Sequence, residues 1–333
     1  MTRVARIAAA AALFSAAAPA RAHHGVAAVG AAGPEGPGAA IETTSPLPLP
    51  QGMLFTMVKS EYVPFLPSAP AVPNEKSYSS FNLVALGFGV RPWLSVFAFQ
   101  PFNVKAQDGL GRNAGPGDTN FMLSLGLKWD DGLQLVPEKE SLDDLMDWHF
   151  GVSVASTLPV GPTTTKGGSG AYFAPDMQTG FGAPSQTLGV STMKQLTGAL
   201  TWLAEASYQR FAPHTYLFTR YQFGDEARLN TAAVFRAYGA GRFRLDFSGE
   251  LNGLYLQPDR QRDATGAMVP LRASGGAILY AVAGLRAYVA PFSAAVALKR
   301  AALTSLNDRA AQQGSEGLER FRAEFTLSYS TRF

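Results

Sequence analysis

The sequence predicts an all-β protein, a transmembrane antiparallel β-barrel of about 12 strands with both termini in the periplasm. Three observations lead to this prediction: an export signal, repeated two-residue alternation of apolar and polar side chains, and connections that alternate between long and short. The composition agrees, because only 16% of the residues are charged, against about 25% in ordinary soluble domains.

The start of the chain has the three parts of a signal peptide. Arg3 and Arg6 precede an apolar run over 7–18, and an Ala-Arg-Ala cleavage motif follows at 20–22. An Ala-rich helix is the alternative. We predict three regions: a signal peptide at 1–22, a flexible Gly/Ala/Pro-rich periplasmic lead-in at 23–51, and an outer-membrane β-barrel at 52–333. The expected location is the outer membrane of a Gram-negative bacterium.

The strands are predicted from alternation with a period of two. Phe121, Leu123 and Leu125 share one face of an extended chain, opposite Met122 and Ser124. A β-sandwich remains the alternative for any single strand. The predicted strands span roughly 53–63, 77–90, 93–104, 118–129, 147–158, 186–196, 199–210, 227–238, 243–256, 273–289, 292–302 and 319–333.

The lengths of the connections support a barrel. Long connections follow the odd-numbered strands, and connections of a few residues, such as Arg91-Pro92, follow most even-numbered strands. The stretch 130–147 breaks this pattern, and the spacing of Leu142, Leu145 and Met146 predicts a small periplasmic helix there.

Two glycine-rich stretches suggest no catalysis. The longest connection contains Tyr172, Phe173 and Phe181, which either fold inward against a ligand or stay on the surface with the loop. Gly115-Pro116-Gly117-Asp118 lacks the lysine and helix of a phosphate cradle, so we interpret it as a turn that begins a strand.

The chain ends in a strand-like alternation, FRAEFTLSYSTRF. We expect this strand to close the barrel against the first strand, with Tyr329 and Phe333 as the signal for the outer-membrane assembly machinery. The other expected partners are outer-membrane lipid and a small-molecule solute. The formal net charge of +3 includes three arginines of the signal segment, so a basic nucleic-acid surface is not expected.

From about residue 78 onward the chain resembles the phenol meta-pathway (MetA-pathway) outer-membrane family. The matching stretches are LGFGVRPWLSVFAFQPF, GPGDTNFMLSLGLKW, STLPVG and GFGAPSQTLGVS, in this order. The resemblance implies an outer-membrane β-barrel with a transport role, no agreed substrate and no catalytic residues. It does not cover the lead-in or the insert at 130–147.

Charged side chains on the polar strand faces are candidates to line the lumen. They either line a water-filled channel or cross the lumen as ion pairs, because buried charges are costly unless they are paired or wetted. The sequence does not decide between these two states. The candidates are Lys128, His149, Glu205, Arg242, Arg244, Asp246, Glu250, Lys299, Arg322 and Glu324.

The mature N-terminus is a candidate metal site. Cleavage after Ala22 would leave a free amine beside His23 and His24, and these nitrogens suit copper, nickel or zinc; a chance polar start is the alternative. No other cofactor and no enzymatic activity are expected, since no serine follows His149 closely enough for a lipase pair. The expected function is an outer-membrane channel or transporter for small solutes or hydrophobic compounds. The alternatives are a non-transporting barrel that binds a metal ion or partner through its His-His segment and loops, and a soluble exported β-protein.

Overall fold

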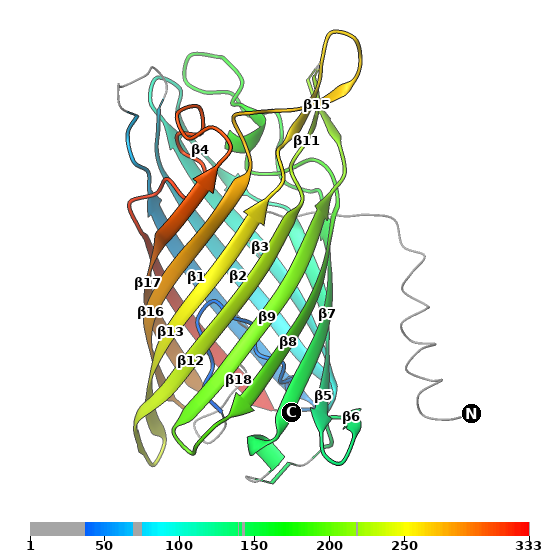
Figure 1. Ribbon diagram of the computed structural model, residues 1–333, viewed down its shortest axis with the longest axis vertical. Coiled ribbons are helices and arrows are strands. Elements are labelled where there is room, and N and C mark those ends of the chain that lie inside the picture. Colours follow the sequence, from blue (N-terminus) through cyan, green and yellow to red (C-terminus); the bar gives the residue numbers. More distant parts are fainter. Residues whose placement is uncertain (1–36, 69–74, 139, 142–143, 218, 333) are drawn as a thin grey trace, which may run out of the picture.

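The computed structural model describes residues 37–68, 75–138, 140–141, 144–217 and 219–332. The strands in this part of the chain form a closed antiparallel β-barrel, as predicted (Figure 1). Its twelve strands are β1 (Met53–Pro64), β2 (Lys76–Arg91), β3 (Leu94–Gln107), β5 (Thr119–Trp129), β7 (Trp148–Leu158), β8 (Ser185–Gln195), β9 (Leu200–Phe211), β12 (Glu226–Ala240), β13 (Phe243–Leu256), β16 (Gly276–Val289), β17 (Phe292–Leu306) and β18 (Arg322–Arg332).

The first and last strands close the barrel. β1 pairs antiparallel with β18, from Met53 opposite Arg332 to Tyr62 opposite Ala323. Every other barrel strand pairs with its neighbours along the chain, and β3 pairs directly with β5. The closed ring therefore leaves no strand edge of the barrel unpaired, which is what a barrel in a lipid bilayer requires.

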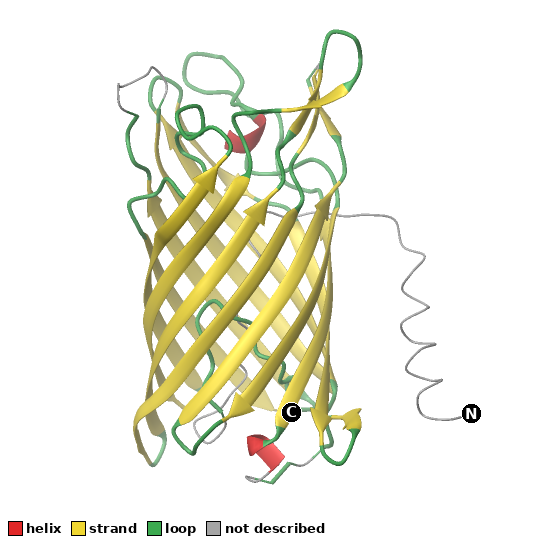
Figure 2. Cartoon of the chain, in the orientation of Figure 1, coloured by secondary structure: helices red, strands yellow, loops and turns green. Residues whose placement is uncertain are grey.

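Shorter elements decorate the two ends of the barrel (Figure 2). Two of them extend barrel hairpins, β4 (Gly111–Pro116) and β6 (Leu133–Leu135). Four form a separate small sheet, β10 (His214–Tyr216), β11 (Thr219–Gln222), β14 (Arg260–Arg262) and β15 (Met268–Pro270). The described residues contain two single-turn 3-10 helices, η1 (Asp144–Met146) and η2 (Pro175–Met177), and η1 lies in the insert where a small helix was predicted.

The two ends of the barrel differ in the length of their connections. The turn end carries the short connections 92–93, 196–199, 241–242 and 290–291, together with the insert 130–147. The loop end carries the connections 65–75, 108–118, 159–184, 212–225, 257–275 and 307–321. Met53 and Arg332 both lie at the turn end, where their strands pair.

The side chains of the wall are arranged with polar groups inside and apolar groups outside. In β13, Phe247 and Leu251 point outward and are about half exposed, whereas Asp246 and Glu250 point inward and are buried. This inversion of a soluble core follows from the alternation in the sequence, and it suits an apolar solvent around the barrel. No helix among the described residues is long and apolar enough to cross a membrane.

Candidate functional site

The lumen contains a piece of the chain itself, residues 37–50, here called the lumen segment. Its first anchor is Thr201 at the turn end of β9, whose Oγ1 accepts a hydrogen bond from the N–H of Gly38 (2.9 Å). Its last anchor is Ser95 at the turn end of β3, whose Oγ accepts from the N–H of Leu49 (2.7 Å). Between these anchors the chain loops up inside the barrel (Figure 1).

This finding corrects the expected flexible lead-in. Residues 37–49 are almost all buried, and Leu49 has no exposed surface. The Gly/Ala/Pro composition predicts a lack of structure, but polar groups of the barrel wall accept hydrogen bonds from the backbone of this stretch. Residues 23–36, with His23 and His24, lie outside the described residues, as do the signal segment 1–22 and Phe333.

Two carboxylates of the wall hold the middle of the lumen segment. The Glu250 carboxylate accepts hydrogen bonds from the backbone N–H groups of Ile41 (2.7 Å), Glu42 (3.1 and 3.2 Å) and Thr43 (2.8 Å), and also from the Thr43 hydroxyl (2.8 Å). The Glu205 carboxylate accepts from the N–H of Thr44 (2.9 Å). Successive N–H groups that converge on one anion form a nest. The two wall carboxylates therefore hold the backbone of the lumen segment and not only its side chains.

Glycines in the barrel wall make room for the lumen segment. A Cβ built at Gly126 or Gly151 would lie under 3.0 Å from Pro48 or Pro46, respectively. A Cβ at Gly284 would collide with the Ile41 side chain, and one at Gly89 would collide with the backbone carbonyls of residues 49 and 50. The absence of side chains at these inward positions is thus a condition for seating the segment.

One wall of the lumen carries the central charge cluster, defined as Glu42 with the residues Lys59, Glu61, Lys299, Arg322 and Glu324 of β1, β17 and β18. Glu42, from the lumen segment, pairs with Lys59 and with Lys299 (2.5 Å). Lys59 also pairs with Glu324 (2.9 Å). Arg322 contacts Glu319 (2.6 Å) and Glu61 (3.4 Å). The cluster therefore ties the segment to the seam at which the barrel closes.

Three carboxylates of this cluster lie close enough together to hold a metal ion. Oxygen atoms of Glu42, Glu61 and Glu324 lie within 4.8 Å of one another, and all three residues are buried. The ammonium groups of Lys59 and Lys299 already contact two of these carboxylates, however, and they supply the compensating positive charge. We assign no metal to the cluster.

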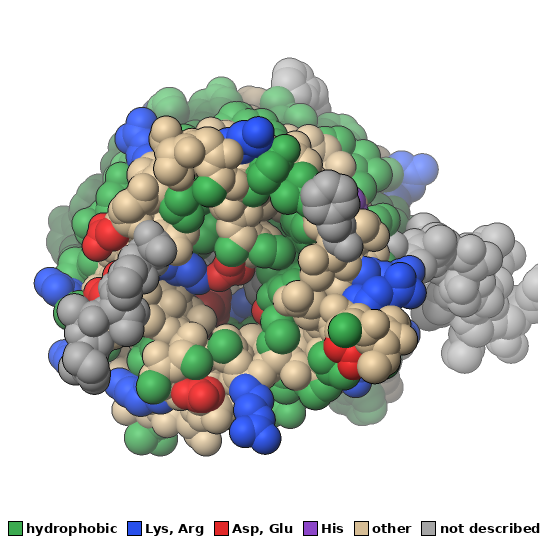
Figure 3. Space-filling view, turned by 90° about the horizontal axis from the view of Figure 1, so that it is seen from above, with side chains coloured by type: hydrophobic (Ala, Val, Ile, Leu, Met, Phe, Trp, Pro, Cys, Tyr) green, Lys and Arg blue, Asp and Glu red, His purple; other side chains and the backbone are tan. Residues whose placement is uncertain are grey.

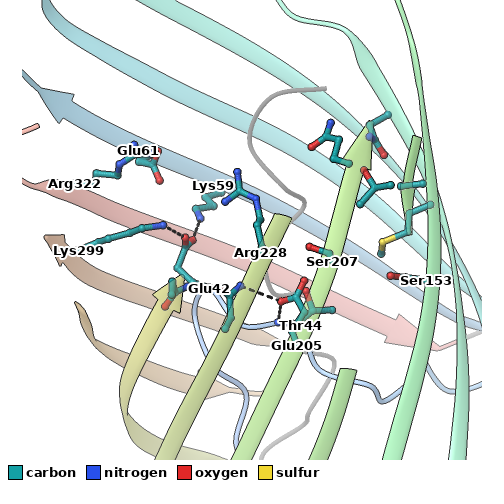
Figure 4. A pocket seen from close by; sticks show the side chains of 17 residues that line it. Glu42, Thr44, Lys59, Glu61, Ser153, Glu205, Ser207, Arg228, Lys299 and Arg322 are labelled. Atoms are coloured by element: carbon teal, nitrogen blue, oxygen red, sulfur yellow. Dashed lines mark hydrogen bonds and ion pairs between the residues drawn. The ribbon is translucent and has the colours of Figure 1, made fainter. Parts of the chain in front are cut away.

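The opposite wall faces the cluster with uncharged polar groups across a chamber of about 80 Å³ (Figure 4). These neutral-wall residues are Asn120, Ser153, Thr187, Ser207 and Gln209, from β5, β7, β8 and β9. Two of these residues are hydrogen-bonded to neighbouring strands: Asn120 donates to the Thr157 hydroxyl (3.1 Å), and Gln209 donates to the Ser185 hydroxyl (3.0 Å). The lumen segment, through Glu42 and Thr44, also lines the chamber.

A second, larger cavity of about 390 Å³ lies toward the loop end. Arg322 lines both cavities, so they meet at the charge cluster. Seen from the loop end, the surface is hollowed at its centre, and acidic and basic side chains lie at the bottom of the hollow (Figure 3). The interior therefore carries charged groups at the cluster, whereas the larger cavity is also lined by apolar side chains such as Phe81, Phe181 and Phe223.

The longest connection, 159–184, folds inward beside this second cavity. Lys105 donates to the carbonyls of Asp176 and Gln178 (2.7 Å each). The Asp118 carboxylate accepts from the N–H groups of Gly161 and Phe181 (2.7 Å each). Of the three aromatic residues that the sequence left undecided, Phe173 and Phe181 are buried and Tyr172 is exposed.

Two predicted lumen residues anchor the insert at the turn end. Lys128 is buried and pairs with Asp144 (2.6 Å), and His149 is buried and contacts Glu140 (3.0 Å). The hydrogen bond from the Lys128 ammonium lowers the pKa of the Asp144 carboxyl. This corner of the barrel is thereby covered by residues 140–141 and 144–147.

All but one of the remaining predicted residues point into the lumen. Glu205, Arg244, Asp246, Glu250, Lys299, Arg322 and Glu324 point inward, and all except the half-buried Glu205 are buried. Arg244 pairs with Asp246 through two 2.6 Å contacts. Arg242 was expected to line the lumen, but it lies in the turn 241–242 and is exposed. The reason is that Gly241, with φ +56°, starts the turn, and the strand resumes only at Phe243.

Four residues that line the lumen were not predicted from the sequence: Glu42, Lys59, Glu61 and Asn252. Lys59 and Glu61 share the face of β1 that also carries Met57, so the alternation alone could have identified them. Glu42 had no such signal, because it lies in a stretch without periodicity.

No protein-family model matches the sequence, and no curated protein matches it. Among solved structures, the chain is similar to the COG4313 outer membrane channel from Pseudomonas putida F1, with a TM-score of 0.64 at 12% identity; the match covers 88% of this chain and 100% of that chain. The NanC porin also matches, with a TM-score of 0.41 at 8% identity, and the match covers 84% of this chain and 99% of that chain. The first similarity establishes that the chain has an outer-membrane β-barrel fold.

Proposed function

We propose that this protein is an outer-membrane channel for small solutes, and that the lumen segment closes it at the turn end. The observation that carries the proposal is a pair of adjoining cavities in the lumen: the larger cavity and the chamber are both lined by Arg322, and the chamber is also lined by Glu42 and Thr44 of the segment. The similarity to an outer membrane channel and the resemblance to the phenol meta-pathway transporters support the same function.

The proposed path requires the lumen segment to move. Its contacts to the wall are hydrogen bonds, ion pairs and van der Waals contacts, and it belongs to none of the paired strands. Displacing the segment would leave the ring of paired barrel strands intact. We therefore propose that solutes cross when the segment leaves its seat, with the turn end facing the periplasm.

A reversible cross-link tests both parts of the proposal. The chain has no cysteine, so a single engineered pair is unambiguous. Pro46→Cys with Gly151→Cys brings the two thiols within reach, because a Cβ at residue 151 would lie 3.1 Å from the Cβ of Pro46; the segment must shift outward slightly to reach the usual spacing of about 3.8 Å in disulfides. The variant Pro46→Cys with Gly151→Ser is the matched control, because it carries the same added Cβ at residue 151 without the second thiol.

Conductance would be measured in planar bilayers, before and after reduction. We expect the oxidised pair to conduct least, and we expect reduction to restore the openings of the control. Equal conductance in both states would refute the gate. If neither the wild type nor the reduced pair conducts or takes up solute in proteoliposomes, the channel proposal fails and the non-transporting alternative gains support.

A further inference from the structure

The chamber between the charge cluster and the neutral wall has the properties of a binding site. Four cationic side chains line it, namely Lys59, Arg228, Lys299 and Arg322. Each already has a carboxylate partner: Lys59 and Lys299 contact Glu42, Arg228 contacts Glu226 (2.6 Å), and Arg322 contacts Glu61 and Glu319. A charged solute would have to compete with these pairs, and breaking a buried pair is costly. The chamber therefore disfavours an anionic solute.

The uncharged groups of the chamber call for hydrogen-bond donors. Asn120 and Asn252 are each 5% exposed and line the chamber. The side-chain carbonyl oxygen of each has no hydrogen-bond partner among the described residues. A buried acceptor without a partner is unfavourable, so an occupant that offers O–H groups gains free energy there.

Hydroxyl groups of the chamber can both donate hydrogen bonds to a solute and accept them from it. Ser153, Thr187 and Ser207 place hydroxyls in the same chamber, and a hydroxyl both donates and accepts. A solute with several hydroxyls can therefore donate to an asparagine carbonyl while it exchanges hydrogen bonds with neighbouring hydroxyls of the chamber. An apolar solute of equal size would leave the two asparagine carbonyls unsatisfied.

The size of the chamber limits the occupant. Since a water molecule needs roughly 10–15 Å³ of such volume, a chamber of about 80 Å³ holds about five to eight waters. Glycerol and erythritol, with three and four carbons, are of this size.

We propose that the chamber binds a small uncharged polyol, or one hydroxyl-rich end of a larger neutral solute. This inference rests on the proposed channel function for its role, because it would make the chamber the solute site of the path. The binding itself does not depend on conduction and is measured separately.

Saturation-transfer difference NMR on the full-length protein detects such weak binding. The protein would be held in a detergent without a sugar headgroup, and erythritol and glycerol would be the probes. Glycerate, which has the size of glycerol but carries a carboxylate, is the charged comparison. We expect signals for the two polyols and a much weaker signal for glycerate.

The variant Asn252→Leu removes one unpartnered acceptor and should weaken erythritol binding about fivefold. Asn82→Leu is the matched control, because Asn82 lies on the outward face of β2, where it bonds Ser60 (2.7 Å). Heat-modifiable migration on gels would verify that both variants keep the barrel. No signal for either polyol, equal binding of glycerate, or an equal loss in the control would each overturn the inference. Conductance without polyol binding refutes this inference alone, whereas polyol binding without conductance refutes only the channel.

Discussion

Two segments enter the barrel from opposite ends, and the wall holds them mainly through opposite hydrogen-bonding groups, although Asp118 also accepts from two N–H groups of the connection 159–184. The lumen segment presents its N–H groups to acceptors of the wall, above all the Glu250 carboxylate. The inward part of the connection 159–184 presents its carbonyls to donors of the wall, chiefly Lys105. The second segment also contributes Phe181 to an aromatic cluster at the loop end, with rings of Phe181 and Phe223 4.8 Å apart.

This difference indicates which segment moves more easily. The loop-end segment is held by donors and by apolar burial together, and the buried rings of Phe181, Phe211 and Phe223 pack against one another. The lumen segment depends more on a few charged acceptors and on the gaps left by wall glycines. A change to one wall residue should therefore release the lumen segment more readily than the loop-end segment.

The largest effect is expected for Glu250→Gln. The amide keeps the shape of the side chain but loses its charge, and its NH₂ group would face backbone donors. We expect the seated state to lose about 3 kcal/mol, or roughly 150-fold in the ratio of seated to released segment. Single-channel open probability should rise accordingly. Glu138→Gln, at an exposed residue of the insert, is the control, and equal behaviour of the two variants would contradict the role of Glu250.

A smaller effect is expected for Gly89→Ala. The added methyl group would meet the carbonyls of residues 49 and 50, which cannot rotate away as a side chain can. Overpacking of this kind costs typically about 2 kcal/mol, or roughly 30-fold. Protease cleavage within residues 37–50 should become faster. At Gly249, which points outward into open space, the same substitution should leave cleavage unchanged.

The loop-end segment should respond less to the loss of its main donor. Lys105→Met removes two hydrogen bonds, but the aromatic cluster remains, so we expect a loss of about 1 kcal/mol in local protection. Hydrogen exchange of residues 173–181 is the measurement. Lys166→Met is the comparison, because Lys166 is exposed and its ammonium lies over the Tyr172 ring (4.6 Å). A larger change in exchange than in Glu250→Gln would reverse the comparison between the two segments.

The barrel was predictable because the alternation of side chains within each strand is a local property of the sequence. The contents of the lumen were not predictable, because they depend on contacts between residues that are far apart in the sequence. Period-two alternation places Phe247 outside and Glu250 inside without reference to any other strand. The partners of Glu250, by contrast, lie more than 200 positions away, in a stretch whose composition suggests no structure. The same limit applies to Gly126 and Gly284, which the sequence shows only as glycines in strands.

The anchoring of the loop end was partly visible. Gly115-Pro116-Gly117-Asp118 was interpreted as a turn, but Gly115 and Pro116 end strand β4, and only Gly117 and Asp118 connect it to β5. The bonds of Asp118 to Gly161 and Phe181, which hold the longest connection, depend on two distant backbone groups. The prediction that Arg242 lines the lumen was wrong for a local reason. The turn at 241–242 decides at which residue the strand and its alternation begin.

The smallest effect is expected from the titration of His214 at the loop end. Its ring packs edge-on against Tyr216 (4.7 Å between ring centres), and a Cβ at Gly182 would collide with it, so it joins β10 to the connection 159–184. Burial lowers the pKa of the His214 imidazole. The unfolded loop therefore binds the proton more tightly than the folded loop, and the stability that His214 contributes is complete above the ordinary histidine pKa of about 6.5 and is lost as the pH falls through the lower folded value. Hydrogen exchange of 181–184 should thus quicken in mild acid in the wild type, with little change in the lumen segment. His214→Phe should remove this pH dependence, and its persistence in that variant would assign it to another group.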